Sequence, residues 1–491
     1  MNYLELLKLA APEAIVVVTA LVVLVIGLSR WNTADSGRRA TTICSLIAAL
    51  GLVLAVGAIV MLPTHAMLFH GMLAVTPINS LFKIICLALA FFTVLMARAE
   101  RFAPNHGEYL ALVLLATIGL MLLVGSEELL MVFIGLELTG LPLYVMAGFD
   151  KNDVRSAEAG LKYFLFGSTA SAFTLFGLSL IYGMSGSTTL AVIGEKLSTE
   201  PVQPLLIAGI VMTLVGFSFK IAVAPFHLWA PDAYQGAPVP SAAFIASGSK
   251  VASFVVLGKI VLIGFGSLRG SAALHTIMGG WSLLLALLAA FSIIIGNLVA
   301  LAQSNVRRLL AYSAVAHAGY TLLGLVAGGR EGFSATLFYT TIYAFTLVGA
   351  FGVVALVRRE TGGDDLSNFS GLWQRSPLLA GCMAIFFLSL AGLPPLAGFF
   401  GKFYLFGVAL RGADNHGLLW LVALALLGSF ISLYYYLIVL KLIFVEEKPA
   451  GSSPIKFGVL QPISISVLAA FVIFLGIWPA PLMAKILASL P

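Results

Sequence analysis

Four ionisable side chains lie within a stretch that otherwise has the composition of a membrane-spanning segment. The stretch GFSFKIAVAPFHLWAPDAYQGAPVPSAAFIASGSK, residues 216–250, contains Lys220, His227, Asp232 and Lys250. A lysine near the middle of a bilayer costs roughly 2.5–3.5 kcal/mol even on lenient insertion scales, so it normally faces a partner or a water-filled cavity. An imidazole between two ammonium groups can relay protons near neutral pH. The pattern predicts a path for protons or other cations.

Further ionisable residues occur inside apolar runs on both sides of this stretch: Glu137, Glu158, Lys162, His317 and Lys402. Glu158 and Lys162 are four residues apart and share one face of a helix, so they form either a local ion pair or part of a path. His227 and His317 are either relay residues or ordinary core histidines. Structural ion pairing would explain one or two such residues, whereas the whole series favours a proton wire or cation path.

Glu137 and Lys220 have oppositely charged side chains in similar surroundings. Each charge is costly to bury alone and much less costly as a pair, so we expect the two to be partners. Separating the pair would favour loss of the Lys220 proton, which is the physical basis of a proton switch. Pro142 and Pro225 each lie five residues beyond the charge and free the carbonyls of Leu138 and Ile221.

The composition requires that these residues be held by membrane-spanning helices. Of the 491 residues, 60% are hydrophobic and 10% are charged, against about 25% charged in soluble domains. Apolar runs of about 20 residues, the length that crosses the hydrocarbon core, recur along nearly the whole chain. We predict an all-α polytopic fold of about 14 spans, at residues 12–30, 41–62, 78–97, 108–125, 128–149, 158–183, 204–229, 238–265, 275–301, 307–328, 333–357, 376–410, 416–445 and 457–486.

Prolines are expected to break the seventh and twelfth spans. Lys402 follows Lys220 by 182 residues and five spans, and the same offset from Glu137 falls at residue 319, beside His317. This offset predicts that a five-helix unit occurs twice, and the copies must be inverted because five is odd. The predicted divisions are 1–106 for three N-terminal helices, 107–266 and 267–446 for the two repeats, and 447–491 for the last helix.

The basic residues indicate the orientation in the membrane. Fifteen of the 27 Lys and Arg residues, among them Arg30, Arg101 and Lys456, fall in loops on one side, and six fall on the other. The positive-inside rule then places both termini on the outer, periplasmic side. These loops explain the net charge of +6, so nucleic-acid binding is not predicted. Without a visible transit peptide, a bacterial inner (plasma) membrane is the simpler expectation.

No cofactor or metal is predicted within this chain. Cys44, Cys86 and Cys382 lie in separate apolar runs without metal-ligand spacing, and no nucleotide-binding loop or haem motif is present. Lys83 and Lys259 lie near the ends of their spans and are expected to extend toward the membrane surface.

Four motifs carry a resemblance to a known family. GLELTGLPLYV, FKIAVAPFHLWAPDAYQGAPVP, LAYSAVAHAGY and GLPPLAGFFGK resemble the antiporter-like subunits of the respiratory NADH:quinone oxidoreductase, complex I. Within that family the chain is most similar to the subunit N group, because the charge in span 12 is Lys402 rather than glutamate. A member of the subunit L group would continue after span 14 into a long lateral helix, which is not expected for this chain.

The resemblance implies roles and partners. Glu137 and Lys220 would form the pair of spans 5 and 7, with Glu158 and Lys162 in span 6. Lys250 would be the central lysine and Lys402 the terminal one, and His227 matches the histidine after the broken span. Protons would move outward, driven by quinone reduction elsewhere. Subunits M and K would be neighbours, and flavin, iron-sulfur clusters and quinone would belong to partner subunits.

Three alternatives remain. The chain could belong to a multisubunit cation/proton antiporter or a membrane-bound hydrogenase, because lysines suit proton transfer without excluding sodium. It could be a structural membrane-arm subunit without its own proton path. A quinone-reducing enzyme would need a redox group, for which the sequence offers no motif.

Overall fold

The computed structural model describes residues 3–29, 34–98, 100, 105–199, 201–412, 417–449, 454–455 and 458–490. Arg30, Arg101 and Lys456, three of the loop residues used for the orientation, lie outside the described residues. The chain divides into two units, each described by itself. Apart from the last two residues, unit 1 contains residues 1–220 and 236–269, and unit 2 contains residues 221–235 and 270–489.

The predicted all-helical membrane fold is confirmed. Among the described residues, thirteen helices are long and apolar enough to cross a membrane, and the remaining predicted span is a pair of shorter helices. The long helices are α2 (Ala11–Leu28), α3 (Ala34–Val60), α4 (Pro77–Ala97), α5 (His106–Gly125), α6 (Leu129–Ala147), α7 (Val154–Ser185), α9 (Pro204–Ile221), α11 (Val239–Lys259, continued by a π-helical turn to Gly264), α12 (Trp281–Leu301), α13 (Val306–Ala327), α14 (Gly329–Thr361), α18 (Leu419–Phe444) and α19 (Leu460–Ile477).

Both predicted helix breaks are present. The seventh span ends at Ile221 of α9 and resumes as α10 (Trp229–Gly236), and the twelfth span consists of α16 (Pro377–Ala391) and α17 (Ala397–Arg411). Each first half is followed by a residue with left-handed backbone, Ala222 with φ 58° or Gly392 with φ 88°. Pro142 behaves differently, because α6 continues through it as one helix.

Short elements complete the chain. They are α1 (Tyr3–Leu9), α8 (Leu190–Thr199), α15 (Leu372–Arg375), α20 (Ala480–Ser489) and three 3₁₀ turns at Phe69–Gly71, Gly266–Leu268 and Leu366–Phe369. Strands β1 (Ala66–Leu68) and β2 (Leu73–Val75) form an antiparallel hairpin in which Ala66 pairs with Val75. This hairpin was not expected from the sequence, where the segment is only a connection between two apolar runs.

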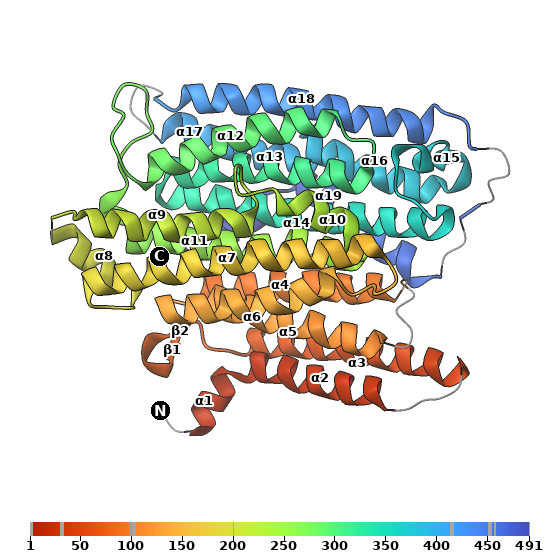
Figure 1. Ribbon diagram of the computed structural model, residues 1–491, viewed down its shortest axis with the longest axis horizontal. Helices are drawn as coiled ribbons and strands as arrows, with labels where there is room; N and C mark the ends of the chain where they lie inside the picture. The colour runs from red at the N-terminus through yellow and green to blue at the C-terminus, as the bar shows by residue number, and fades with distance from the viewer. Residues whose placement is uncertain are drawn as a thin grey trace. The chain divides into compact units, whose positions relative to one another are not determined.

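Unit 1 is built around α5 and α11. Helix α5 packs against α2, α4 and α6, and α11 packs against α4, α5 and α6 (Figure 1, red to yellow-green). Every residue of α11 is buried, so this helix is the core of the unit. Helix α7 packs on α6 and has much of its surface exposed.

Unit 2 is built around α13 and α14. Helix α13 packs against α12, α14 and α17, and α14 also packs against α16, α17 and α19 (Figure 1, green to blue). The residues of α14 from Gly332 to Val357 are all buried. Helix α18 covers α12 and α16, and it brings a further set of polar side chains into this core.

Candidate functional site

Lys220 lies in the last turn of α9 and its ammonium is held by α6. Its side chain is buried, with 6% exposure, and Nζ donates a hydrogen bond to the Tyr144 hydroxyl at 3.2 Å. The ammonium also lies 5.3 Å from the centre of the Tyr144 ring, within the range of a cation–π interaction. Gly140 leaves the space for it, because a Cβ there would lie 2.8 Å from Nζ.

Glu137 is not paired directly with Lys220. Its carboxylate accepts a hydrogen bond from the Ser171 hydroxyl of α7, and no ion pair joins it to Lys220 within the described part of the chain. The predicted direct pair is therefore wrong for this structure. The reason is that each charge has a neutral partner instead. Ser171 binds the Glu137 carboxylate, and Tyr144 binds the Lys220 ammonium. Glu137, Gly140 and Tyr144 follow one face of α6, so the two charges are separated by about one helical turn.

Glu158 and Lys162 form the ion pair that their spacing predicts. The distance from Nζ to Oε1 is 2.6 Å, and the side chains are 55% and 38% exposed. Both project from α7 among exposed apolar side chains such as Leu161 and Phe164. Glu137, near the middle of α6, is also only half-buried. Unit 1 therefore exposes charge along α6 and α7.

Lys250 lies at the centre of α11 and is 2% exposed. Ser247 and Ser253 are three residues away on either side and are also buried, so the side chain has hydroxyl groups on neighbouring turns of its own helix. Of the candidate residues, unit 1 contains Glu137, Glu158, Lys162, Lys220 and Lys250.

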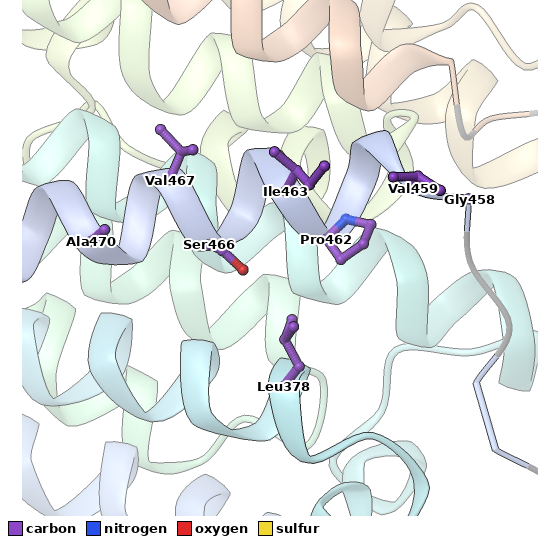
Figure 2. Close-up of a pocket in the computed structure, with 8 residues that line it drawn as sticks. All are labelled: Leu378, Gly458, Val459, Pro462, Ile463, Ser466, Val467 and Ala470. Atoms are coloured by element: carbon purple, nitrogen blue, oxygen red, sulfur yellow. The ribbon is translucent and has the colours of Figure 1, made fainter.

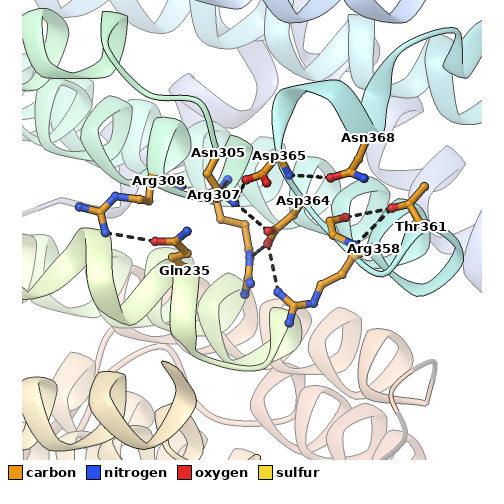
Figure 3. Close-up of polar contacts among 10 residues, drawn as sticks. Gln235, Asn305, Arg307, Arg308, Arg358, Thr361, Asp364, Asp365 and Asn368 are labelled. Carbon is orange, nitrogen blue, oxygen red and sulfur yellow. Dashed lines mark hydrogen bonds and ion pairs between the residues drawn. The ribbon is translucent and has the colours of Figure 1, made fainter. Parts of the chain in front are cut away.

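His227 lies in unit 2, in the segment between the two halves of the seventh span. It is 6% exposed, its Nδ1 has no hydrogen-bond partner among the described residues, and its ring centre is 6.2 Å from that of Tyr312. The following half-helix, α10, is fixed to α13 by an ion pair of 2.7 Å between Asp232 and Arg308. Figure 3 shows the neighbouring hydrogen bond of 3.1 Å from Arg308 to Gln235.

Lys402 lies in α17 and reaches back to the end of α16. Its Nζ donates to the Ala391 carbonyl at 2.9 Å and to the Ser429 hydroxyl at 2.7 Å, and it lies 5.2 Å from the centre of the Tyr320 ring. The side chain is 4% exposed. This charge is accommodated by a helix C-terminus, a hydroxyl and an aromatic face.

Lys220 and Lys402 occupy different positions relative to their helix breaks. Lys220 precedes Ala222 by two residues, whereas Lys402 follows Gly392 by ten. The offset of 182 residues therefore compared residues on opposite sides of the break. The ammonium groups nevertheless have similar surroundings, because Lys220 is in the last turn of α9 and Lys402 reaches the last carbonyl of α16. The negative end of a helix dipole favours a cation at both places.

His317 is held at both ring nitrogens. Nδ1 lies 2.6 Å from the Tyr339 hydroxyl of α14, and Nε2 lies 3.2 Å from the Tyr436 hydroxyl of α18. The Tyr436 hydroxyl is also hydrogen-bonded to Ser313. Unit 2 thus contains His227, His317 and Lys402 of the candidate residues, with His317 at the meeting point of α13, α14 and α18.

Two further lysines form ion pairs that the sequence did not predict. Lys83 pairs with Glu13 at 2.6 Å and Lys259 with Glu127 at 2.9 Å. Lys259 also donates to Asn79 at 2.7 Å and to the carbonyls of Val124 and Ser126. The expectation that both lysines extend to the membrane surface is wrong, since both are buried. The sequence did contain a signal for these pairs. Glu13 and Glu127 each lie at the end of an apolar run, on the same predicted side of the membrane as the lysine that each one binds.

A cluster of charges in unit 2 joins the start of α13 to the end of α14 (Figure 3). Asp364 accepts hydrogen bonds from Arg307, from Asn305 at 2.7 Å and from Arg358 at 3.2 Å. Burial alone would raise the pKa of Asp364, but Arg307, the Asn305 hydrogen bond and Arg358 together lower its pKa below the ordinary value of 3.8. The cluster therefore stabilises the packing of the start of α13 against the end of α14.

One cavity of about 550 Å³ lies between α16 and α19 (Figure 2). It is lined by Leu378 and by residues between 458 and 470, and Ser466 supplies the single polar side chain of this lining. Such a surface suits hydrocarbon and offers no group for acid–base chemistry. Within the described residues, no three His, Cys, Asp or Glu side chains are grouped as a metal site.

Comparison with known proteins identifies the family. Residues 126–432, which include all eight candidate residues, match the family described as NADH:quinone oxidoreductase/Mrp antiporter, transmembrane. The chain belongs to this family, and the resemblance predicted from the sequence is confirmed.

Individual relatives agree with this assignment. The chain is 43% identical to NADH-quinone oxidoreductase subunit N 2 of Acidobacterium capsulatum, with 98% of each chain covered. It is 38% identical to NAD(P)H-quinone oxidoreductase subunit 2 of a Synechocystis species, covering 94% of this chain and 88% of the relative.

Solved structures give the same fold. A chain of respiratory complex I from Thermus thermophilus is 32% identical, with a TM-score of 0.78 over 96% of this chain and 98% of that one. A chain of the Mrp complex from a Dietzia species has a TM-score of 0.83 at 20% identity, covering 99% of this chain and 97% of that one. At this lower identity the likeness concerns the fold alone.

Proposed function

We propose that this chain is a proton-translocating membrane subunit of an NADH:quinone oxidoreductase. The observation that carries the proposal is the burial of Lys220, Lys250 and Lys402 in a chain whose relatives are named as quinone oxidoreductase subunits. Lys220 and Lys402 contact hydroxyl, carbonyl and aromatic groups. A lysine with neutral partners can lose its proton without leaving an unpaired carboxylate in a low-dielectric interior.

Glu137 and Lys220 form the switch in this proposal. Ser171 now binds the carboxylate and Tyr144 the ammonium. If Glu137 turns toward Lys220 across Gly140, attraction between opposite charges stabilises the protonated lysine. When Ser171 binds the carboxylate again, that attraction is lost and Lys220 gives up its proton more readily.

The remaining residues would pass the proton onward. In the proposed order it moves from Lys220 through His227 to Lys250, then through His317 to Lys402, which releases it on the outer side. Glu158 and Lys162 would supply protons to Lys220 from the cytoplasmic end of α7. Quinone reduction in other subunits drives the cycle, and flavin, iron-sulfur clusters and quinone are held by those subunits. The chain thus contributes ion translocation to an oxidoreductase.

We also propose that residues 107–266 and 267–446 are inverted repeats. In unit 1, Leu129 N donates to Thr188 O at 2.9 Å and Leu190 N to Glu127 O at 3.1 Å. In unit 2, Val306 N donates to Asp364 O at 2.9 Å and Leu366 N to Ser304 O at 2.8 Å. In the first predicted repeat, these bonds join the connection after span 4 to the connection after span 6. In the second predicted repeat, they join the connections after spans 9 and 11, which hold the equivalent places. Their recurrence supports the repeat.

The exposed charges of unit 1 support the inference that other membrane subunits bind this chain. Glu137, Glu158 and Lys162 are exposed or half-buried along membrane-spanning helices, where contact with hydrocarbon would be costly. Another membrane subunit is expected to cover this face, and we propose subunits M and K as the neighbours. The assembly would lie in a bacterial inner membrane with both termini of this chain on the periplasmic side.

The proposal is tested by purifying the chain from mildly solubilised membranes and placing the assembly in lipid vesicles. We expect NADH:quinone reductase activity to copurify and NADH oxidation to drive protons across the vesicle membrane. Copurification with hydrophobic subunits alone, without flavin or iron and with sodium-dependent proton exchange, would replace the proposal with a cation/proton antiporter.

Substitution of Gly140 tests the position of the Lys220 ammonium. In Gly140→Ala the new Cβ would lie 2.8 Å from Nζ of Lys220 and 3.1 Å from the Tyr144 hydroxyl. The flexible lysine can move away, so we expect normal assembly and a proton-pumping rate about fivefold lower, because general acid–base transfer depends on position. Gly57→Ala is the matched control, since nothing lies within 4 Å of its Cβ. Equal pumping rates in the two variants would contradict the assigned position.

A further inference from the structure

One face of α18 carries hydroxyl groups that the proposed path does not use. Ser429, Ser432 and Tyr436 are three and four residues apart, so they lie on one face of the helix. Ser432 and Tyr436 are fully buried. We call these three residues the α18 hydroxyl row. From the first residue to the last, the row extends about 10 Å along the helix.

The two ends of the hydroxyl row contact two candidate residues of unit 2. At one end, Ser429 accepts a hydrogen bond from Nζ of Lys402 at 2.7 Å. At the other end, the Tyr436 hydroxyl lies 3.2 Å from Nε2 of His317. Between them, the Ser432 hydroxyl donates to the Ser429 carbonyl at 2.6 Å. The hydroxyl groups at the two ends of the row therefore contact Lys402 and His317, both of which belong to unit 2.

Buried polar residues around Lys402 hold its side chain at the Ser429 end of the hydroxyl row. Tyr320, whose ring lies under the Lys402 ammonium, accepts a hydrogen bond from Asn297 at 2.8 Å. Asn297 in turn accepts from the Tyr435 hydroxyl at 3.2 Å. Both tyrosines and Asn297 are fully buried. The Lys402 side chain is thereby kept next to Ser429.

We propose that the α18 hydroxyl row passes protons from His317 to Lys402. Protonated His317 gives its Nε2 proton to the Tyr436 oxygen as Tyr436 gives its own hydroxyl proton to the next acceptor. Ser432 and Ser429 repeat this exchange, and the last transfer converts the neutral amine of Lys402 to an ammonium. Each hydroxyl releases one proton for each that it receives, so the net change is one proton moved. Hydroxyl rotation and single water molecules bridge the one-turn gaps.

This proposal rests on the proposed function and is tested in the assembled complex in vesicles. Tyr436→Phe removes one hydroxyl and retains the ring that packs 5.1 Å from Phe387. Tyr434→Phe is the control, because Tyr434 is on the same helix and 63% exposed. We expect Tyr436→Phe to lower the proton-pumping rate at least fivefold with a normal amount of complex, and Tyr434→Phe to leave it unchanged.

Two further variants test the hydroxyl row even if Tyr436→Phe does not assemble. Ser432→Ala is expected to lower pumping by a similar factor, and it decides the question if Tyr436→Phe fails to assemble. Lys402→Met separates the two proposals. If Lys402→Met stops pumping while Tyr436→Phe and Ser432→Ala pump normally, the hydroxyl row is not the path. If Lys402→Met itself pumps normally, the proposed function fails as well.

Discussion

Lys220→Met should lower the proton-pumping rate of the assembled complex at least tenfold. Methionine retains the length and apolar packing of the lysine but cannot bind a proton, and general acid–base steps contribute roughly 10²- to 10⁴-fold to the rates they assist. The variant also removes a buried charge whose partners are neutral, so folding should not suffer. Proton uptake into vesicles during NADH oxidation is the measurement.

The control for this prediction is Lys151→Met. Lys151 lies in the connection between α6 and α7 and is exposed, so its loss should leave pumping unchanged. A Lys220→Met complex that pumps at the rate of the Lys151→Met complex would remove Lys220 from the path. Lower pumping in both variants to the same degree would point to a general effect of lost positive charge.

Asp364→Asn should destabilise the protein by about 3–5 kcal/mol, the usual cost of removing one member of a buried ion pair. Arg307 is 1% exposed and Asp364 is 4% exposed, so the guanidinium would be left in the interior without its carboxylate. Thermal unfolding of the solubilised complex at neutral pH measures the effect. The double variant Arg307→Leu with Asp364→Leu removes both charges and should be closer to the wild type in stability.

Acid provides a second check on the same residue. The pKa of Asp364 in the folded protein is below its ordinary value of 3.8. Its contribution to stability is therefore fully present above the unfolded pKa and is lost as the pH falls through the folded pKa. The stability difference between wild type and Asp364→Asn should persist from neutral pH to about pH 4 and shrink below it. A difference that is unchanged at pH 3 would contradict the role assigned to the carboxylate.

Features that depend on local spacing could be predicted from the sequence. Runs of about 20 apolar residues correspond to the spanning helices, and the prolines near residues 225 and 395 mark the broken helices. The ion pair between Glu158 and Lys162 follows from four-residue spacing on one helix. The resemblance of four short motifs led to the correct family, because those motifs contain most of the buried charges.

Contacts between distant segments could not be predicted in the same way. Whether Glu137 meets Lys220 depends on how α6 and α9 are rotated about their axes. It also depends on the neutral side chains of Ser171 and Tyr144, which nothing in the sequence marks as the partners of these charges. The partners of Lys83 and Lys259 are 70 and 132 residues away. Lys402 was compared with Lys220 by sequence offset, although its long side chain reaches back across the break to Ala391.

Proton movement through this chain is tested most directly by the number of protons moved per NADH oxidised by the assembled complex carrying Lys250→Met. Lys250 is buried at the centre of α11, between the two ends of the proposed path. We predict that the variant assembles and moves fewer protons per NADH than the wild type. An unchanged proton number at an unchanged rate of NADH oxidation would show that protons do not pass through this chain, and the structural-subunit alternative would then hold.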